Sequence, residues 1–178
     1  MQLIIDLPSR EVSLATHRRR WSEVVADSRW YNCRERIETN ALGQIIMTPP
    51  PAEWHSDRQG QLVYQLQHRL GGRAKPECPV VTSDGVKAVD VGWYSEARHP
   101  IVSGQLACEV APDICVEVLS PSNTDSEIQN KFRLYFEAGA VECWICDLEG
   151  GMIYYANDDV ERAAESSTLC PQFPKVIR

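Results

Sequence analysis

Three stretches of the chain carry apolar residues at helical spacing, and each predicts a helix. The first covers residues 11–27, and its apolar stripe consists of Leu14, Trp21, Val24 and Val25. The second covers residues 53–70 and begins after three prolines, and its apolar spine consists of Leu62, Leu66 and Leu70. The third covers residues 125–138, where the spacing of Thr124 and Glu127 fits a capping box.

Between and after these helices, short runs of alternating apolar and polar residues predict strands. Residues 34–47 fit two strands joined by a turn, and residues 80–82 and 86–93 flank a Ser-Asp-Gly turn. A further strand is predicted at residues 113–119, and three more are predicted at 143–147, 152–155 and 173–177. This order of elements predicts a mixed α/β fold with a central sheet flanked by helices.

Two of the predicted strands carry acidic residues on one face. In residues 86–93 the alternation puts Ala88, Asp90 and Gly92 on one face, and the other face consists of Val89, Val91 and Trp93. In residues 113–119 the apolar face consists of Ile114, Val116 and Val118. Asp113 and Glu117 therefore share the opposite face. A buried carboxylate needs a cationic side chain, a hydrogen-bond network or a hard cation such as Mg²⁺ as its partner.

The composition is that of an ordinary water-soluble domain. The chain has 178 residues, of which 43% are hydrophobic and 24% are charged, and this length suits one domain better than two. No apolar run approaches the roughly 20 residues that a membrane helix needs. The first residues lack the basic region and cleavage pattern of a signal peptide, so the expected location is the cytoplasm.

Seven cysteines are present, and their odd number favours reduced thiols over a disulfide framework. Cys143 and Cys146 form a C-x-x-C sequence, which is compatible with a redox motif or half of a zinc site. However, both lie in a predicted strand, where positions i and i+3 face opposite sides. We therefore interpret these two cysteines as buried structural residues.

The formal net charge is −7, which argues against tight nonspecific binding to DNA. The charge is uneven, because residues 1–36 contain seven Lys and Arg against five Asp and Glu, a balance of +2. The run Arg18–Arg20 belongs to this basic part. It is either a solvated helix face or a contact to a nucleic-acid backbone, and we favour the solvated face.

Several segments together resemble one known family. Residues 111–151, APDICVEVLSPSNTDSEIQNKFRLYFEAGAVECWICDLEGG, are very similar to the signature segment of the Uma-two family of "putative restriction endonucleases". Supporting similarity comes from RERIETNALGQIIMTPPPAEWHS at 34–56, AVDVGWYS at 88–95 and CPQFP at 170–174. That family belongs to the PD-(D/E)XK nuclease superfamily. The resemblance implies a restriction-endonuclease-like core in a single domain over residues 1–178, with an N-terminal helical segment at 1–30.

The resemblance also implies a set of functional residues. Asp90 and Glu117 match the two motif acids and would hold Mg²⁺ or Mn²⁺. The usual lysine two residues after the glutamate is replaced by Leu119, and Lys131 in the following helix takes its place. Lys131 would be the third catalytic residue. The possible supporting residues are Glu38, Asp113 and Tyr135, of which Tyr135 shares a helix face with Lys131.

The resemblance implies metal-dependent hydrolysis of phosphodiester bonds. The expected partner is a nucleic acid, in the first place DNA, and a homodimer is left open. Two departures favour a different function on the same fold, a catalytically inactive nucleic-acid-binding or regulatory module. Val89 stands where the motif has proline, and the literal E-x-K sequence is absent. Asp113 is as readily a structural residue as a catalytic one, and we interpret His55 as a hydrogen-bonding residue rather than a base. We expect Asp90 and Glu117 to converge in one cleft, with Lys131 pointing into it.

Overall fold

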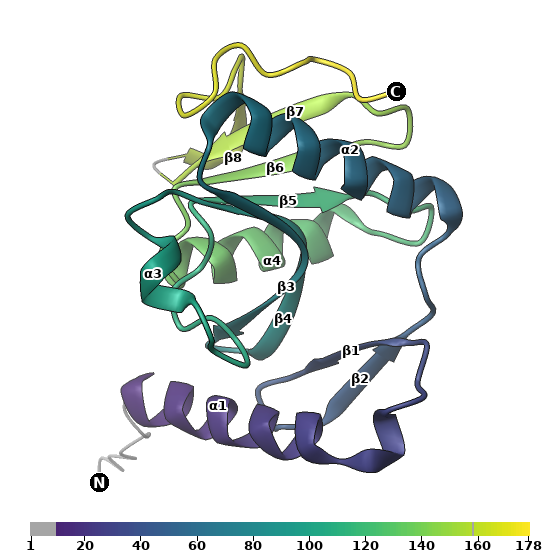
Figure 1. The fold of residues 1–178 in the computed structure, drawn as a ribbon, viewed down its shortest axis with the longest axis vertical. Helices are drawn as coiled ribbons and strands as arrows, with labels where there is room; N and C mark the ends of the chain where they lie inside the picture. The colour runs from purple at the N-terminus through teal and green to yellow at the C-terminus, as the bar shows by residue number, and fades with distance from the viewer. Residues whose placement is uncertain (1–9, 158) are drawn as a thin grey trace, which may run out of the picture.

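A six-stranded mixed sheet forms the centre of the fold in the computed structural model, which describes residues 10–157 and 159–178 (Figure 1). In spatial order its strands are β3 (Arg73–Thr82), β4 (Gly85–Tyr94), β5 (Ile114–Val118), β6 (Glu142–Cys146), β7 (Met152–Ala156) and β8 (Asp159–Ala164). Strands β5 and β6 are parallel, and every other neighbouring pair is antiparallel. The predicted mixed sheet is confirmed. Residues 1–9 of the predicted N-terminal helical segment lie outside the described residues.

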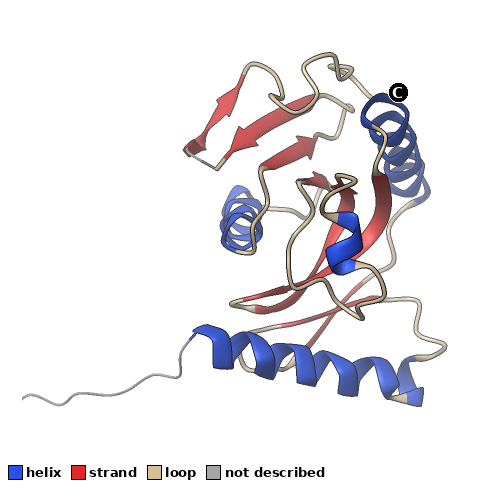
Figure 2. Ribbon diagram, turned by 60° about the vertical axis from the view of Figure 1, so that its left-hand side comes forward, coloured by secondary structure: helices blue, strands red, loops and turns tan. Residues whose placement is uncertain are grey.

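Helices α2 (Glu53–Leu70) and α4 (Asp125–Glu137) cover opposite faces of this sheet (Figure 2). Alternation along β5 supplies both cores: Ile114, Val116 and Val118 pack on the α2 side, whereas Cys115 packs on the α4 side. The predicted limits of α2 and the capping box of α4 are both confirmed. The site residues carried by these helices are therefore held on rigid elements.

A second layer lies at the far end of the β3–β4 ribbon (Figure 1). It consists of α1 (Arg10–Ala26), the short 3₁₀ helix η1 (Ser28–Trp30), and the hairpin of β1 (Arg36–Thr39) and β2 (Ile45–Thr48). Trp21 and Val24 of α1 pack against Val81 and Val86, as the predicted stripe requires, but Val25 of that stripe is exposed. Another short helix, α3 (His99–Val102), follows β4.

The predicted strands differ from the structure at both edges of the sheet. β3 begins at Arg73 rather than at residue 80, although the added segment contains Pro76 and Pro79. An edge strand tolerates proline because one side of it needs no backbone donor. The strand predicted at 173–177 is wrong, because this segment forms only an isolated bridge from Val176 to Gly151. The edge strand is instead β8, which the pattern did not reveal.

The predicted faces of β4 are wrong at one residue. Val91 and Trp93 pack on the α2 side of the sheet, whereas Val89 packs on the α4 side. The ladder between β3 and β4 skips the pair of Glu77 and Asp90, and Glu77 has a left-handed backbone with φ of 50°. This irregularity changes which face the following residues present, and it lies directly across from Asp90.

The cysteine interpretation is confirmed. All seven cysteines are free thiols, and Cys143 and Cys146 are buried on opposite faces of β6. Among the helices that the structure describes, none combines the length and apolar character needed to cross a bilayer.

Glu142 at the start of β6 fastens the C-terminal tail to the sheet. Its carboxylate accepts hydrogen bonds from Trp144 Nε1 (2.7 Å), Ser167 Oγ (2.6 Å), Thr168 N (2.7 Å), Thr168 Oγ1 (2.5 Å) and Leu169 N (3.0 Å). Burial alone would raise the pKa of Glu142, but the donors from Ser167, Thr168 and Trp144 outweigh burial and lower it. The tail then reaches the core, where Phe173 packs on the Trp144 ring.

We predict that Glu142→Ala lowers the free energy of unfolding by about 3 kcal/mol, because it leaves several buried donors without an acceptor. Urea denaturation at pH 7.5 measures the loss. Glu149→Ala, which removes an exposed carboxylate in the turn after β6, is the matched control and should stay within about 0.5 kcal/mol of wild type. Equal effects from the two substitutions would contradict the anchoring role of Glu142.

Candidate metal centre

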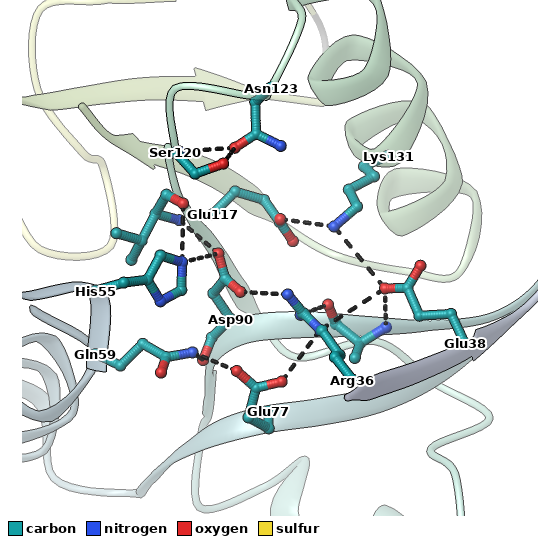
Figure 3. A network of polar contacts seen from close by, with 12 residues as sticks. Arg36, Glu38, His55, Gln59, Glu77, Asp90, Glu117, Ser120, Asn123 and Lys131 are labelled. Atoms are coloured by element: carbon teal, nitrogen blue, oxygen red, sulfur yellow. Dashed lines mark hydrogen bonds and ion pairs between the residues drawn. The ribbon is translucent and has the colours of Figure 1, made fainter. Parts of the chain in front are cut away.

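Strands β4 and β5 separate where the predicted acids lie. Backbone pairing between them ends at Val91 and Val116, and beyond that point side chains satisfy the strands' polar groups. Val118 N donates to Asp90 Oδ2 (2.7 Å), His55 Nε2 donates to Val118 O (3.1 Å), and Gln59 Nε2 donates to the Asp90 carbonyl (3.1 Å). The polar side chains that gather around this opening are drawn in Figure 3.

Asp90 lies at the centre of these contacts and is only 2% exposed. Its Oδ1 accepts from Arg36 Nη1 at 2.7 Å, and its Oδ2 lies 3.4 Å from His55 Nε2. Burial alone would raise the pKa of Asp90, but the His55 hydrogen bond and the Arg36 charge outweigh burial and lower it. For His55, burial alone would lower the pKa, but the contact with Asp90 reverses the direction and raises it. Asp90 is therefore an anion with cationic neighbours.

Glu117 faces Asp90 from the next strand. Each acid lies one residue beyond the Val91–Val116 pair, which is the last backbone pair of the two strands. Glu117 is 3% exposed; Lys131 Nζ donates to its Oε2, and the Tyr135 hydroxyl donates to its Oε1, both at 2.8 Å. Burial and the Asp90 charge raise the pKa of Glu117, although Lys131 acts in the opposite direction. The two acids thus have pKa values shifted in opposite directions.

Strand β1 of the N-terminal hairpin contributes two side chains, Arg36 and Glu38, to the same opening. Glu38 Oε1 accepts from Ala88 N (2.9 Å) and lies 3.9 Å from Lys131 Nζ. Arg36 donates to the Ala88 carbonyl as well as to Asp90. Because β1 is attached to β4 through these side chains, the hairpin contributes both a cation and a carboxylate to the site.

Glu77 and Gln59 support Arg36 from its other side. Glu77 Oε2 lies 3.1 Å from Arg36 Nε, and Glu77 Oε1 accepts from Gln59 Nε2 at 2.5 Å. The left-handed backbone of Glu77 is a conformation that a residue with a side chain adopts at a cost of about 1 kcal/mol or more. Strain of this kind persists where surrounding contacts fix it, as Gln59 and Arg36 do here.

Five of the six predicted site residues come together in the structure: Asp90, Glu117, Lys131, Glu38 and Tyr135. The first four are labelled in Figure 3. The sixth, Asp113, does not join them. Its carboxylate accepts from Ser95 N (2.8 Å) and pairs with Arg98 Nε (3.1 Å), which fixes the loop after β4. The catalytic roles of the five residues stay predictions.

Four further polar residues belong to the site. Arg36, Gln59 and Glu77 were not identified from the sequence, and His55 was interpreted there only as a hydrogen-bonding residue. A signal for two of them was present. His55 and Gln59 continue the buried stripe of Leu62 and Leu66 toward the start of α2, at positions i, i+4, i+7 and i+11. Polar residues on an apolar helical stripe indicate either a buried hydrogen-bond network or a site.

The site carries more carboxylates than cationic groups. Four carboxylates surround two permanent cations, Arg36 and Lys131, so the formal charge of the cluster leaves two negative charges uncompensated. Mg²⁺ requires oxygen ligands and commonly uses only one or two carboxylates, completed by water and substrate. Residues 10–157 and 159–178 contain no group of three or more His, Cys, Asp and Glu side chains placed to hold a metal.

The chain is similar to proteins that are described as putative nucleases. A family model described as "Putative restriction endonuclease" (Uma2) matches residues 27–174. Four chains of solved structures match, among them a "putative nuclease belonging to DUF820" from Anabaena variabilis. This nuclease has a TM-score of 0.59 and 22% identity, and the match covers 72% of this chain and 74% of that one. No curated protein matches the chain at a significant level of similarity.

We predict a pH dependence of stability that belongs to Glu117. Because its pKa in the folded protein is raised above the ordinary value of 4.5, the folded state holds this proton to higher pH than the unfolded state does. The contribution of Glu117 to the free energy of unfolding therefore falls as pH rises from 4.5 through the folded pKa, and then levels off. Glu117→Gln lacks this decrease, so its stability relative to wild type should increase over that interval. Urea denaturation of both proteins from pH 4 to 9 measures the difference, and a difference that is independent of pH would contradict the assignment.

Proposed function

The chain belongs to the Uma2 family, and from this premise we propose that it is a divalent-metal-dependent endonuclease that hydrolyses phosphodiester bonds in DNA. The restriction-endonuclease-like fold supports the proposal. The observation that carries it is the contact of Lys131 Nζ with Glu117 Oε2 at 2.8 Å, across from Asp90. Two acids and a lysine thus belong to one cluster of polar contacts, although the lysine comes from α4 and not from position 119.

We propose that Asp90 and Glu117 bind one Mg²⁺ or Mn²⁺ ion. Bound there, the ion would make an attacking water more nucleophilic and offset charge on the phosphate. The chain's own residues prepare this position. Tyr135 holds one oxygen of Glu117, Val118 N holds one oxygen of Asp90, and burial excludes bulk water from both.

Lys131 is the group placed to meet the substrate. It lies between Glu117 and Glu38, and its side chain is 21% exposed, more than any carboxylate of the site except Glu77. An ammonium group that is charged and reachable from solvent can hold a scissile phosphate oxygen or orient the attacking water. The nearby carboxylates Glu117 and Glu38 raise the pKa of Lys131 despite its burial, which keeps the ammonium charged.

The net charge of −7 limits how the protein can bind DNA. Few phosphates can be neutralised by so acidic a chain, so we expect weak nonspecific affinity. Productive binding then depends on contacts close to the site. Cleavage assays should therefore be performed at low ionic strength.

A second candidate function is a catalytically silent nucleic-acid-binding or regulatory module. One observation favours it: both oxygens of Asp90 and both oxygens of Glu117 already contact nitrogen or hydroxyl donors of the chain. Such a site is internally satisfied and would resist an added cation. The predictions of a single domain over residues 1–178, a cytoplasmic location and a homodimer stay predictions.

We predict that the purified protein cuts DNA in Mg²⁺ or Mn²⁺ at low salt and stops when chelator is added. Asp90→Asn, Glu117→Gln and Lys131→Met should each reduce cleavage by a factor of at least about 100, because each removes a charge from the reacting centre. Single-stranded DNA, double-stranded DNA and RNA should be compared by gel assay.

Glu96→Gln and Lys175→Met change exposed residues outside the site and should retain wild-type cleavage. Melting temperatures measured in chelator identify variants that lose activity by unfolding. If neither metal supports cleavage of any of the three substrates and neither shifts the melting temperature, the silent module replaces the nuclease.

A further inference from the structure

The guanidinium of Arg36 has one nitrogen that its contacts leave without a hydrogen bond. Nη1 donates to Asp90 Oδ1 at 2.7 Å, and Nη2 donates to the Ala88 carbonyl. Nε is buried and has no hydrogen-bond partner among the described residues, although Glu77 Oε2 lies 3.1 Å away (Figure 3). That distance suits a hydrogen bond, so it is the direction of the N–H group that misses the acceptor. A small rotation of the side chain would align Nε with Glu77.

Glu77 offers its carboxylate to Arg36 from a strained backbone. Its φ of 50° lies in the left-handed region, which glycine would adopt without strain. Gln59 Nε2 donates to Glu77 Oε1 at 2.5 Å and to the Asp90 carbonyl at 3.1 Å, which fixes the carboxylate and leaves Oε2 facing Arg36. Strain that is kept beside a polar site indicates a role for the residue that bears it.

Arg36 and a divalent cation would compete for Asp90. Oδ2 of this carboxylate already accepts from Val118 N at 2.7 Å, so Oδ1 is the oxygen that remains for a cation. A carboxylate oxygen has a second lone pair. A guanidinium nitrogen 2.7 Å from Oδ1 would nevertheless repel a divalent ion strongly, because burial limits the screening of charge by water. Tight binding of a cation therefore requires that Arg36 give up Oδ1.

We propose that Glu77 is a positioning residue of the metal site, which receives Arg36 when a divalent cation takes Asp90 Oδ1. This inference rests on the proposed metal-dependent function. The transfer exchanges one hydrogen bond, from Nη1 to Asp90, for another, from Nε to Glu77, and it moves no proton. Without Glu77 the released guanidinium, whose side chain is 18% exposed, would lose its counter-ion in a largely buried place. An unpaired buried charge is costly, so the cation would bind less tightly.

Glu38 is the other carboxylate beside Arg36 Nε, and it is the poorer acceptor. Its Oε1 lies 3.9 Å from Nε, whereas Glu77 Oε2 lies at 3.1 Å. The same Glu38 oxygen also accepts from Ala88 N, so a new bond to Arg36 would disturb an existing one. Glu77 is therefore the residue on which the transfer depends.

Calorimetric titration of the full-length protein with Mg²⁺ measures the effect of Glu77 on the affinity for the cation. We expect Glu77→Gln to weaken Mg²⁺ binding at least about tenfold, because the uncharged amide cannot neutralise the guanidinium. Glu53→Gln is the matched control. It removes the same charge from an exposed glutamate in the first turn of α2 and should change the affinity less than about twofold.

A double-mutant cycle distinguishes action through Arg36 from a direct effect of the Glu77 charge on the cation. In an Arg36→Met background, Glu77→Gln should leave Mg²⁺ affinity unchanged, since no guanidinium remains to be received. An equal loss of affinity in both backgrounds would overturn the proposal. Melting temperatures in chelator verify that each variant is folded.

Nuclear magnetic resonance follows the transfer without any change to Arg36. In wild type, Mg²⁺ should move the Arg36 Nε–H proton resonance downfield, because this group gains a hydrogen bond, and Glu77→Gln should lack the shift. A wild-type resonance that saturating Mg²⁺ leaves in place would contradict the transfer, even if Arg36→Met fails to fold.

Asp90→Asn separates failure of the metal site from failure of the role of Glu77. If Mg²⁺ and Mn²⁺ do not bind wild type, or bind equally well after Asp90→Asn, the proposed metal site fails and the role of Glu77 fails with it. If binding depends on Asp90 but Glu77→Gln binds Mg²⁺ as tightly as wild type, only the role of Glu77 fails.

Discussion

The site depends on one constraint: a buried backbone group that leaves the β-ladder must find another partner. β4 and β5 stop pairing after Val91 and Val116, yet the chain on both sides stays buried. Asp90 accepts the freed Val118 N–H, and Gln59 donates to the freed Asp90 carbonyl. Each side chain that bonds one of these backbone groups places a polar group in the interior of the sheet. The opening of the sheet and the polar cluster are therefore one structural feature.

The electrostatic surroundings then shift the pKa values of the two acids in opposite directions. Asp90 has the guanidinium of Arg36 and the ring of His55 beside it, and these contacts lower its pKa although the residue is buried. Glu117 has a lysine and a hydroxyl but also faces the charge of Asp90, and its pKa is raised. One acid is thus a fixed anion, and the other is sensitive to the charge around it. A divalent cation placed near both would favour ionised Glu117 and so couple metal binding to release of its proton.

Much of this arrangement was predictable from local sequence. Three features depend on neighbouring residues: the alternation of β5, the caps of α4 and the prolines before α2. These features predicted the correct elements and the correct face for Glu117. The face of Val89 was not predictable, because it depends on the strained backbone of Glu77 in the neighbouring strand. Asp113 and Glu117 share a strand face, yet only Glu117 reaches α4, since Arg98 and Ser95 hold Asp113 at the other end of β5. Arg36 lies 54 residues before Asp90, and no periodicity connects two such distant residues.

The second layer is part of the site because of Arg36. Removing its guanidinium would leave Asp90 with one fewer cation in a place where water cannot replace it, and an unpaired buried charge is strongly destabilising. Arg36 is also attached to the Ala88 carbonyl and Glu77, so the hairpin cannot move away from β4 without breaking contacts to all three residues. α1 packs on the ends of β3 and β4 through Trp21 and Val24, and the hairpin joins the same apolar cluster through Ile37 and Ile45. Packing in a layer remote from Asp90 thereby fixes the cation that keeps Asp90 ionised, and the polar site is a property of both layers.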